Sequence, residues 1–468
     1  MSRYGRGSEE GKIKKQKAKS KKQKAKGLRA EDSGLSLKLE TRNSKLETRN
    51  FSKLDFGLPS FPLDGWLLFA SRVVRLFAYG FLSIILALHL AVVGMTDRQI
   101  GFVLTLTLIG DAALSLLVTQ IADRVGRRRM LIASASLMIF AGATFAMTSD
   151  PWLLIVAAFI GTLSPTGHEA GPFLPLEQAA LAQLIPGTQR TRVFAWYNLV
   201  GSFAAALGAW SGGMVVTILQ RTALTPLSSY HFMFASYAGF GLLMGLVFSF
   251  LSSRIEVAHL DTQGPSRFFG LHRSWKMIRN LSILFACDSF AGALVLQSLL
   301  AYWFYTRFGV EPATLGQLFF GANILAGCSA LVAARVAARI GLINTMAFTH
   351  LPANVFLLLT PLMPTFPLAA TMVLLRYSTA QMDVPTRQAY LMAVVAPDER
   401  SAAAGVTALA RTMASAFGPV VTGALFSASL MSVPFFLAGG IKILYDLALY
   451  WNFRHIKPSE ESKDEKQV

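Results

Sequence analysis

The sequence predicts an all-α membrane protein with twelve transmembrane helices, arranged as two six-helix pseudosymmetric halves. Three observations support this prediction. Only 15% of the 468 residues are charged, whereas a soluble domain carries about 25%. Apolar runs recur from Trp66 to Phe453, and many approach the ~20 residues that cross a bilayer. Finally, short motifs of the first part of the chain recur at equivalent spans of the second part.

Twelve apolar runs are the expected spans. They cover residues 66–94, 99–122, 130–148, 152–184, 193–219, 231–252, 280–307, 315–337, 344–362, 366–394, 401–430 and 434–453. The expected organisation is a basic disordered N-terminal tail (1–63), an N-terminal six-helix half (64–252), a cytoplasmic linker (253–279), a C-terminal six-helix half (280–455) and a cytoplasmic C-terminal tail (456–468).

The predicted N-terminal tail is strongly basic. Residues 1–65 hold 17 Lys/Arg against 8 Asp/Glu, a net charge of +9 out of +18 for the chain. The heptad Lys38–Ser44 is repeated as Lys45–Phe51 with one difference. Such a segment is too polar to build a core. It could bind anionic lipid or RNA, but a solvated tail is the favoured interpretation, and no secretory signal is expected before the first span.

The loops between the spans alternate in charge. One set contains Arg124, Arg127, Arg128, Arg129, Arg190, Arg192, Arg254, Arg267, Arg273, Lys276, Arg279, Arg339 and Arg400, whereas the other contains mainly Arg98, Arg221 and Arg307. Lys/Arg-rich loops stay cytoplasmic. Both termini are therefore expected in the cytoplasm, with the protein in the cell (inner or plasma) membrane and an even number of spans.

The internal repeat relates equivalent spans. At an offset of 215, Ile100-Gly101 aligns with Leu315-Gly316 and residues 122–126 align with 337–341. At an offset of 210, residues 175–179 align with 385–389, and Arg190, Gly208 and Gly213 meet Arg400, Gly418 and Gly423. Two halves of the same topology are typical of alternating access, with a substrate site between them near the bilayer midplane.

The loop after the second span reads Asp123-Arg-Val-Gly-Arg-Arg-Arg129. It resembles the signature of the major facilitator superfamily, Gly-x-Leu-Ala-Asp-Arg-x-Gly-Arg-Arg/Lys, with Thr119 in place of the first Gly and Ile121 in place of the Leu. The resemblance covers about residues 64–455. It implies the twelve-span fold of that family, solute transport, and a conformational latch formed by Asp123, Arg124, Gly126, Arg127 and Arg128.

A second family pattern is only partial. Gly208-Ala-Trp-Ser-Gly-Gly213 is similar to the Gly-Pro-x-x-Gly-Gly pattern of drug antiporters, but Ala209 stands at the proline position. Small residues also allow close helix packing, so a plain helix interface is the alternative. The Arg-x-x-Gln-Gly pattern of proton antiporters is absent from the fourth span, which counts against proton-driven export.

Ionisable and polar groups inside spans are costly in lipid and commonly line a cavity or pair with one another. The candidates for substrate binding or ion coupling are Arg72, Arg75, Tyr79, Asp111, His168, Glu169, Asp288, Arg376, Asp383 and Arg411. Glu169 is the first candidate for proton coupling and His168 the second, because two prolines and two glycines around them predict a broken helix. The alternative is an ion pair with an arginine of the first or eleventh span.

The arginines inside the spans suggest a second kind of binding site. Arg75, Arg376 and Arg411 could bind an organic anion, since guanidinium groups favour carboxylate and phosphate. Alternatively, they neutralise Asp111, Glu169 and Asp288. Lys442 and Asp446 are four residues apart in the last span and are expected to pair locally. Glu177, Arg387 and Arg400 complete the candidate latch, because Glu177 and Arg387 occupy the same repeat position with opposite charges.

The sequence contains no metal-ligand cluster, P-loop or nucleophile elbow, so no cofactor, no metal and no enzymatic activity are expected. The leading hypothesis is a secondary active transporter of a small organic solute that works by proton-coupled efflux. The alternatives are an organic-anion or nutrient uptake transporter and, from another class, a non-transporting membrane sensor. The expected partners are a small-molecule substrate, protons and the lipid bilayer, with no nucleic acid, and the protein is expected to be monomeric.

Overall fold

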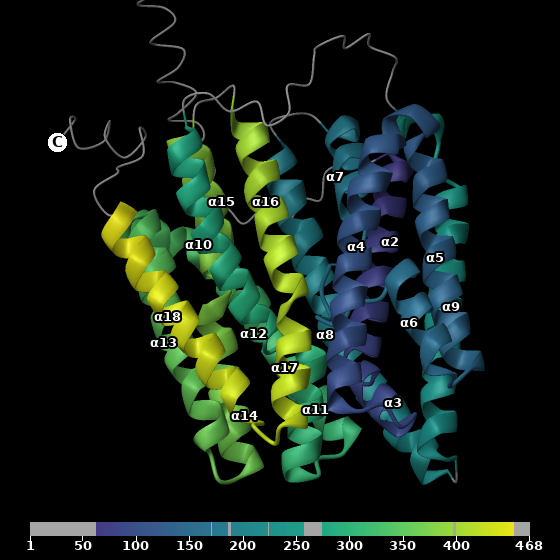
Figure 1. Ribbon diagram of the computed structural model, residues 1–468. Coiled ribbons are helices and arrows are strands. Elements are labelled where there is room, and N and C mark those ends of the chain that lie inside the picture. Colours follow the sequence, from purple (N-terminus) through teal and green to yellow (C-terminus); the bar gives the residue numbers. More distant parts are fainter. Residues whose placement is uncertain are drawn as a thin grey trace, which may run out of the picture. The chain divides into compact units, whose positions relative to one another are not determined.

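The computed structural model describes residues 62–169, 171–185, 189–222, 224–256, 274–395 and 399–453, and these residues form helices and no strand (Figure 1). The predicted N-terminal tail up to residue 61, residues 257–273 of the predicted linker and the predicted C-terminal tail lie outside the described residues. We call residues 62–256 the N-terminal segment and residues 274–453 the C-terminal segment.

The N-terminal segment consists of eight helices and a short 3-10 turn. The helices are α2 (Leu63–Ser83), α3 (Leu86–Val92), α4 (Asp97–Val125), α5 (Arg127–Met147), α6 (Pro151–Ile160), α7 (Phe173–Leu184), α8 (Arg190–Arg221) and α9 (Pro226–Ser249), followed by η3 (Ser253–Ile255). Local sequence sets the ends of α4. Thr96 and Gln99 form a reciprocal capping box at its start, and Gly126 ends it with a φ of 108° that favours glycine.

The C-terminal segment follows a similar order of helices, with the counterpart of α8 divided into α16 and α17. It contains α10 (Trp275–Ala293), α11 (Gln297–Phe308), α12 (Pro312–Ile340), α13 (Leu342–Leu359), η4 (Thr360–Leu362), α14 (Phe366–Ala380), α15 (Asp383–Val394), α16 (Arg400–Ala416), α17 (Gly418–Ser427) and α18 (Val433–Phe453). Helix α12 ends at Gly341, the repeat counterpart of Gly126, which also has a positive φ of 82°. The aligned motif therefore ends equivalent helices in the two segments.

Ten helical segments among the described residues are long and apolar enough to cross a membrane. The expected fourth and tenth spans are not among these ten, because each is broken into two shorter helices. Residues 161–172 separate α6 from α7, and Gln381-Met382 separate α14 from α15. Pro165 and Pro172 lie in the first break, where missing backbone N–H groups prevent a continuous helix.

The helices pack in two groups that share a boundary. In the N-terminal segment α2 packs on α8 and α9, α5 on α9, and α4 on α6. In the C-terminal segment α10 packs on α16 and α18, and α13 on α14 and α18. The segments meet mainly where α8 packs on α12 and α4 on α17, helices that lie between the outer helices α13 and α5 in Figure 1.

Two matched joints hold the segments together. Each pairs Gly-x-x-x-Thr of the N-terminal segment with Pro-x-x-x-Gly of the C-terminal segment, namely Gly101 and Thr105 with Pro419 and Gly423, and Gly213 and Thr217 with Pro312 and Gly316. The threonine Oγ1 accepts a hydrogen bond from the N–H that follows each proline, at 3.0 Å from Val420 to Thr105 and at 3.0 Å from Ala313 to Thr217. Both joints lie toward the end of the bundle where α4 and α12 begin, which we call the Asp97 end.

The close backbone approach at these joints requires glycine. A Cβ atom on Gly213 would lie 2.2 Å from the carbonyl oxygen of Pro312, and one on Gly101 would lie 2.4 Å from that of Pro419. We therefore expect Gly213→Ala to destabilise this arrangement by about 1–3 kcal/mol, since the helices must move apart. The midpoint of thermal unfolding in detergent measures the effect. Gly239→Ala is the control, because no atom lies within 4 Å of its added Cβ, and equal midpoints for the two variants would contradict the prediction.

Candidate functional site

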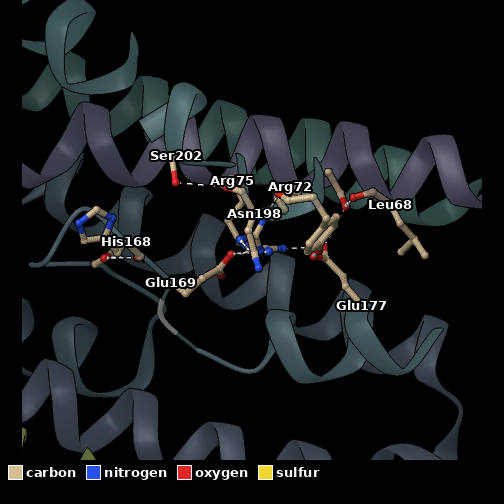
Figure 2. A network of polar contacts seen from close by, with 11 residues as sticks. Leu68, Arg72, Arg75, His168, Glu169, Glu177, Asn198 and Ser202 are labelled. Atoms are coloured by element: carbon tan, nitrogen blue, oxygen red, sulfur yellow. Dashed lines mark hydrogen bonds and ion pairs between the residues drawn. The ribbon is translucent and has the colours of Figure 1, made fainter. Parts of the chain in front are cut away.

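A buried network, which we call the N-terminal charge cluster, joins Ser71, Arg72, Arg75, Glu169, Glu177, Tyr197 and Asn198 (Figure 2). Arg72 projects from α2 toward α8. Its Nε donates to the carbonyl oxygen of Tyr197 at 2.7 Å and its guanidinium lies over the Tyr197 ring at 4.1 Å. The remaining two nitrogens bind the side chains of Glu169 and Asn198, so each of its three nitrogens makes at least one hydrogen bond.

Arg75 lies one turn further along α2 and is completely buried. It binds Glu177 at 2.5 Å and Glu169 at 3.2 Å, and thus joins both carboxylates. Glu177 of α7 also accepts from the hydroxyl groups of Ser71 and Tyr197. Two arginines and two glutamates are therefore paired within one segment, and their charges cancel.

Glu169 lies in the irregular stretch between α6 and α7. Figure 2 shows its side chain extended toward the two arginines, with the His168 ring set apart from them. One carboxylate oxygen of Glu169 binds both arginines, whereas the buried Oε2 has no hydrogen-bond partner. The alternative interpretation is an ion pair with an arginine of the first or eleventh span, and pairs with two arginines of the first span are present. The proton-coupling role of His168 and Glu169 stays a prediction.

The helix breaks of the two segments meet one another. Ser298, at the start of α11, donates its Oγ to the carbonyl oxygens of Ser83 at 2.6 Å and Pro165 at 2.8 Å. The adjacent Gln297 donates to the Ser83 hydroxyl at 2.7 Å and keeps a buried Oε1 without a partner. Irregular backbone at membrane depth is tolerated where protein or a cavity satisfies it, and here the opposite segment supplies part of that satisfaction.

Asp111 stands apart from both the cluster and the breaks. It lies halfway along α4, is 6% exposed, and neither carboxylate oxygen has a hydrogen-bond or ion-pair partner. Helix α4 is fixed at this level because it crosses α6 closely: a Cβ atom on Gly110 would lie 1.9 Å from the carbonyl oxygen of Phe159. A buried polar group without a partner is costly, so Asp111 is the unexplained acidic group of the N-terminal segment.

The C-terminal segment has its own buried network, which we call the C-terminal charge cluster. Asp288 of α10 binds Lys442 through Oδ1 and Arg387 through Oδ2, the latter at 3.2 Å. Arg387 also binds Asp383, one turn earlier on α15, at 3.1 Å. The cluster continues through Asp446 of α18, which binds His350 at 2.8 Å and Asn354 at 2.8 Å.

The prediction of a local pair between Lys442 and Asp446 is wrong. Lys442 forms its ion pair with Asp288, and Asp446 forms its own with His350. Both partners come from other helices, and spacing along α18 alone could not reveal them.

The loop at Gly126 makes its described contacts within the N-terminal segment. The Glu256 carboxylate accepts from the backbone N–H groups of Arg127 at 2.7 Å and Arg128 at 3.2 Å. The Arg127 side chain donates to Gln183 and to the Ile255 carbonyl, and that of Arg128 donates to the Ser249 carbonyl. Arg124 is exposed, and the side chain of Asp123 lies outside the described residues. A latch role for this loop stays a prediction.

Glu177 and Arg387 do not meet in this structure. Each is buried in its own segment, where Glu177 binds Arg75 and Arg387 binds Asp288 and Asp383. In this state each is held by charge pairs inside its own segment, with reversed polarity between α2–α7 and α10–α15, and a latch role for Glu177 and Arg387 stays a prediction. Arg400 begins α16 and is exposed.

The remaining predicted site residues lie on separate elements. Arg411 of α16 donates its Nε to Ser289 at 3.1 Å and is half-buried. Arg376 of α14 is also half-buried, has a buried Nε without a partner, and lies over the ring of Tyr377 at 5.3 Å. Tyr79 is buried in α2. Convergence of Arg75, Arg376 and Arg411 on one anion stays a prediction.

Sequence reasoning missed several polar members of the clusters. They are Ser71, Asn198, His350 and Asn354, all inside apolar helices. One signal was available: His350 and Asn354 are four residues apart and share a face of α13. For Asn198 and Ser71 the partners come from distant spans, so the sequence around them carried no comparable signal.

Comparisons with known proteins agree with this architecture. The sequence profile described as Major Facilitator Superfamily matches residues 68–381. A membrane protein of Saccharomyces cerevisiae, described as uncharacterized and named YJR124C, is 30% identical over 82% of this chain and 92% of its own length. A Na⁺, Li⁺, K⁺/H⁺ antiporter of Planococcus maritimus is 30% identical over 25% of this chain and 27% of its own length.

Among solved structures, that of the nucleoside transporter NupG superposes with a TM-score of 0.66. It is 13% identical and covers 84% of this chain and 100% of its own, so the likeness concerns the fold. The family match, the similarity over most of the yeast protein and the helical fold lead to one assignment. The chain is a multi-pass membrane protein that belongs to the Major Facilitator Superfamily of transporters.

Proposed function

We propose that this protein exports a small organic solute by proton-coupled alternating access, with Asp111 as the residue that carries the proton. Counting the two broken spans as membrane-crossing gives twelve spans in two six-helix halves, with the termini in the cytoplasm. The observation that carries the proposal is the carboxyl group of Asp111, buried halfway along α4 without a partner.

Asp111 fits a proton carrier better than Glu169 does. A proton that binds Asp111 breaks no ion pair, because none is present in this state. A proton that binds Glu169 must weaken its pairs with Arg72 and Arg75, and separating buried paired charges is costly. In the proposed cycle, the neutral and charged forms of Asp111 favour different arrangements of α4, which also forms one of the two joints.

The contacts between the segments support alternating access. Besides the joints, Tyr302 donates to Asp97 at 2.6 Å, and Arg221 pairs with Glu311 at 3.1 Å. These contacts lie at the Asp97 end, whereas the arginine-rich loop at Gly126 is at the other end of α4. With arginine-rich loops in the cytoplasm, this arrangement is closed on the outer side, and the joints must separate for outward release.

Two observations favour export. The partial antiporter pattern at Gly208–Gly213 packs α8 against α2 through Gly208 and Gly212, and its last residue, Gly213, belongs to the second joint. The region of similarity to the Planococcus antiporter covers a quarter of the chain. Exchange of a proton for an outgoing solute would then use the same conformational change in both directions.

Organic-anion uptake is the second candidate function, and Arg411 favours it. Its only described hydrogen bond goes from Nε to Ser289, and no described carboxylate lies within ion-pair distance of it. If this alternative holds, carboxyfluorescein should raise the midpoint of thermal unfolding in detergent, and Arg411→Ala should abolish that shift. Stabilisation by the lipophilic cation ethidium, unchanged in Arg411→Ala, would reject it in favour of cation export.

Transport in proteoliposomes tests the proposed function. We expect an imposed pH gradient to drive ethidium across the membrane in vesicles that contain the wild-type protein, with the movement abolished by an ionophore that collapses the gradient. Empty vesicles are the control. Ethidium binding without gradient-driven movement would instead favour a non-transporting sensor.

A further inference from the structure

The described residues of the C-terminal charge cluster include three carboxylates and two fixed cations, and the His350–Asp446 pair is where a proton would balance them. Its carboxylates are Asp288, Asp383 and Asp446, whereas Arg387 and Lys442 are the fixed cations that pair with them. Both cations form ion pairs with Asp288, and Arg387 also forms an ion pair with Asp383. Asp446 is left with His350 and the neutral Asn354 as its polar partners. The charge of the cluster thus depends on whether His350 holds one proton or two.

The position of His350 allows its ring to hold either one proton or two. It is buried in α13, with Nδ1 2.8 Å from Asp446 and 3.4 Å from the Asn354 amide. In this arrangement Nδ1 can donate to Asp446 in both protonation states, so an added proton is carried at Nε2. Histidine is the side chain whose ordinary titration falls near neutral pH.

The charged surroundings of His350 come from several packed helices. They are Asp446, Lys442 and Tyr445 of α18, Asp288 of α10, and Asp383 and Arg387 of α15, while α14 and α12 carry Arg376, Tyr377, Arg335 and Arg339. The last two arginines are exposed near the end of α12. Arg411 binds Ser289 beside Asp288. Asp446 is therefore the carboxylate closest to His350, and Lys442 is the cation nearest to Asp446 along α18.

We propose that His350 and Asp446 form a second proton-binding site, separate from Asp111, and that Lys442 links it to the Asp288–Arg387 pair. With His350 doubly protonated, Asp446 has a cation, and Lys442 can stay on Asp288, where the structure places it. When His350 loses that proton, Asp446 lacks a cation. Lys442, one helical turn away on the same face, is then drawn from Asp288 toward Asp446, which leaves Arg387 as the sole cation on Asp288.

The site would deliver a second proton per cycle to the transporter proposed above, and only that consequence rests on the proposed function. Proton binding itself can be measured without solute or gradient. The chain has seven histidines, so selective ¹⁵N labelling of histidine in the detergent-solubilised full-length protein gives few side-chain signals to follow by NMR.

We expect the side-chain signal of His350 to titrate between pH 5 and 9. This signal is identified as the one that disappears in His350→Gln. His231→Gln is the matched control, since His231 also lies in an apolar helix and has Ser149 at 3.5 Å. Should His350→Gln fail to fold, Asn354→Leu serves the same purpose, because it removes a neighbour of the ring and should displace the same signal.

Two results would overturn the proposal. A spectrum without a titrating signal from His350 between pH 5 and 9 would make the His350–Asp446 contact a fixed hydrogen bond. For the link, Lys442→Met should displace the midpoint of titration by about one pH unit, a tenfold change in proton affinity. An unchanged midpoint in Lys442→Met would remove Lys442 from the site. Failure of ethidium transport would leave both measurements intact and would count against the proposed function alone.

Discussion

Replacing Asp111 by asparagine is expected to abolish ethidium movement driven by a pH gradient while leaving the fold intact. Asparagine keeps the size of the side chain and resembles the neutral carboxyl group, but it cannot exchange a proton. Asp111 has no hydrogen-bond or ion-pair partner in this structure, so the substitution leaves no charge without its counter-ion. We expect a loss of at least about a hundredfold in gradient-driven flux, in line with the removal of an essential proton-transfer group.

Glu169→Gln is the matched comparison. It removes a charge from the same segment but breaks pairs with Arg72 and Arg75, so its main effect is expected on stability rather than on the dependence of flux on pH. Exchange of ethidium across the membrane without a gradient should survive in Asp111→Asn. Gradient-driven flux that persists in Asp111→Asn and is lost in Glu169→Gln, in a protein of normal stability, would transfer the coupling role to Glu169.

Arg75→Leu is expected to produce the largest loss of stability. Arg75 is fully buried and binds both Glu169 and Glu177. Its removal leaves Glu177 buried with only the hydroxyl groups of Ser71 and Tyr197. Breaking a buried ion pair from one side costs about 3–5 kcal/mol, so the variant should unfold at a clearly lower temperature in detergent.

The double variant Arg75→Leu with Glu177→Leu distinguishes the loss of a counter-ion from the loss of packing. Removing both charges should recover part of the stability lost in either single variant, because no uncompensated charge remains at this position. Arg72 still pairs with Glu169 in the double variant. A double variant less stable than both single variants would show that packing of the side chains, rather than charge pairing, dominates.

The class of protein could be predicted from the sequence because lipid imposes simple requirements. Long apolar helices and arginine-rich loops leave a pattern in the residue order, and the helical membrane fold and the family are both confirmed. The motif at Asp123–Arg129 and its counterpart at residues 337–341 both mark helix ends at glycines with positive φ. These features are local, and local features are what a single sequence displays.

The partners of the charged residues could not be predicted in the same way. Arg75 meets Glu177 across 102 residues, and Lys442 meets Asp288 across 154. The spacing of Lys442 and Asp446 favoured a local pair, but Asp446 pairs with His350 of α13 and Lys442 pairs with Asp288 of α10. The breaks in the fourth and tenth spans were only partly foreseen, since prolines predicted the first break and the second comes before Asp383 and Pro385.

Proton movement caused by solute is the most direct test of the central claim. Proteoliposomes containing wild-type protein would be loaded with the pH indicator pyranine and exposed to an ethidium gradient without an imposed pH difference. The account predicts that protons move across the membrane in the direction opposite to ethidium and thereby change the internal pH. This change should be absent from vesicles with Asp111→Asn. Ethidium movement without any change of internal pH in wild-type vesicles would contradict proton-coupled transport.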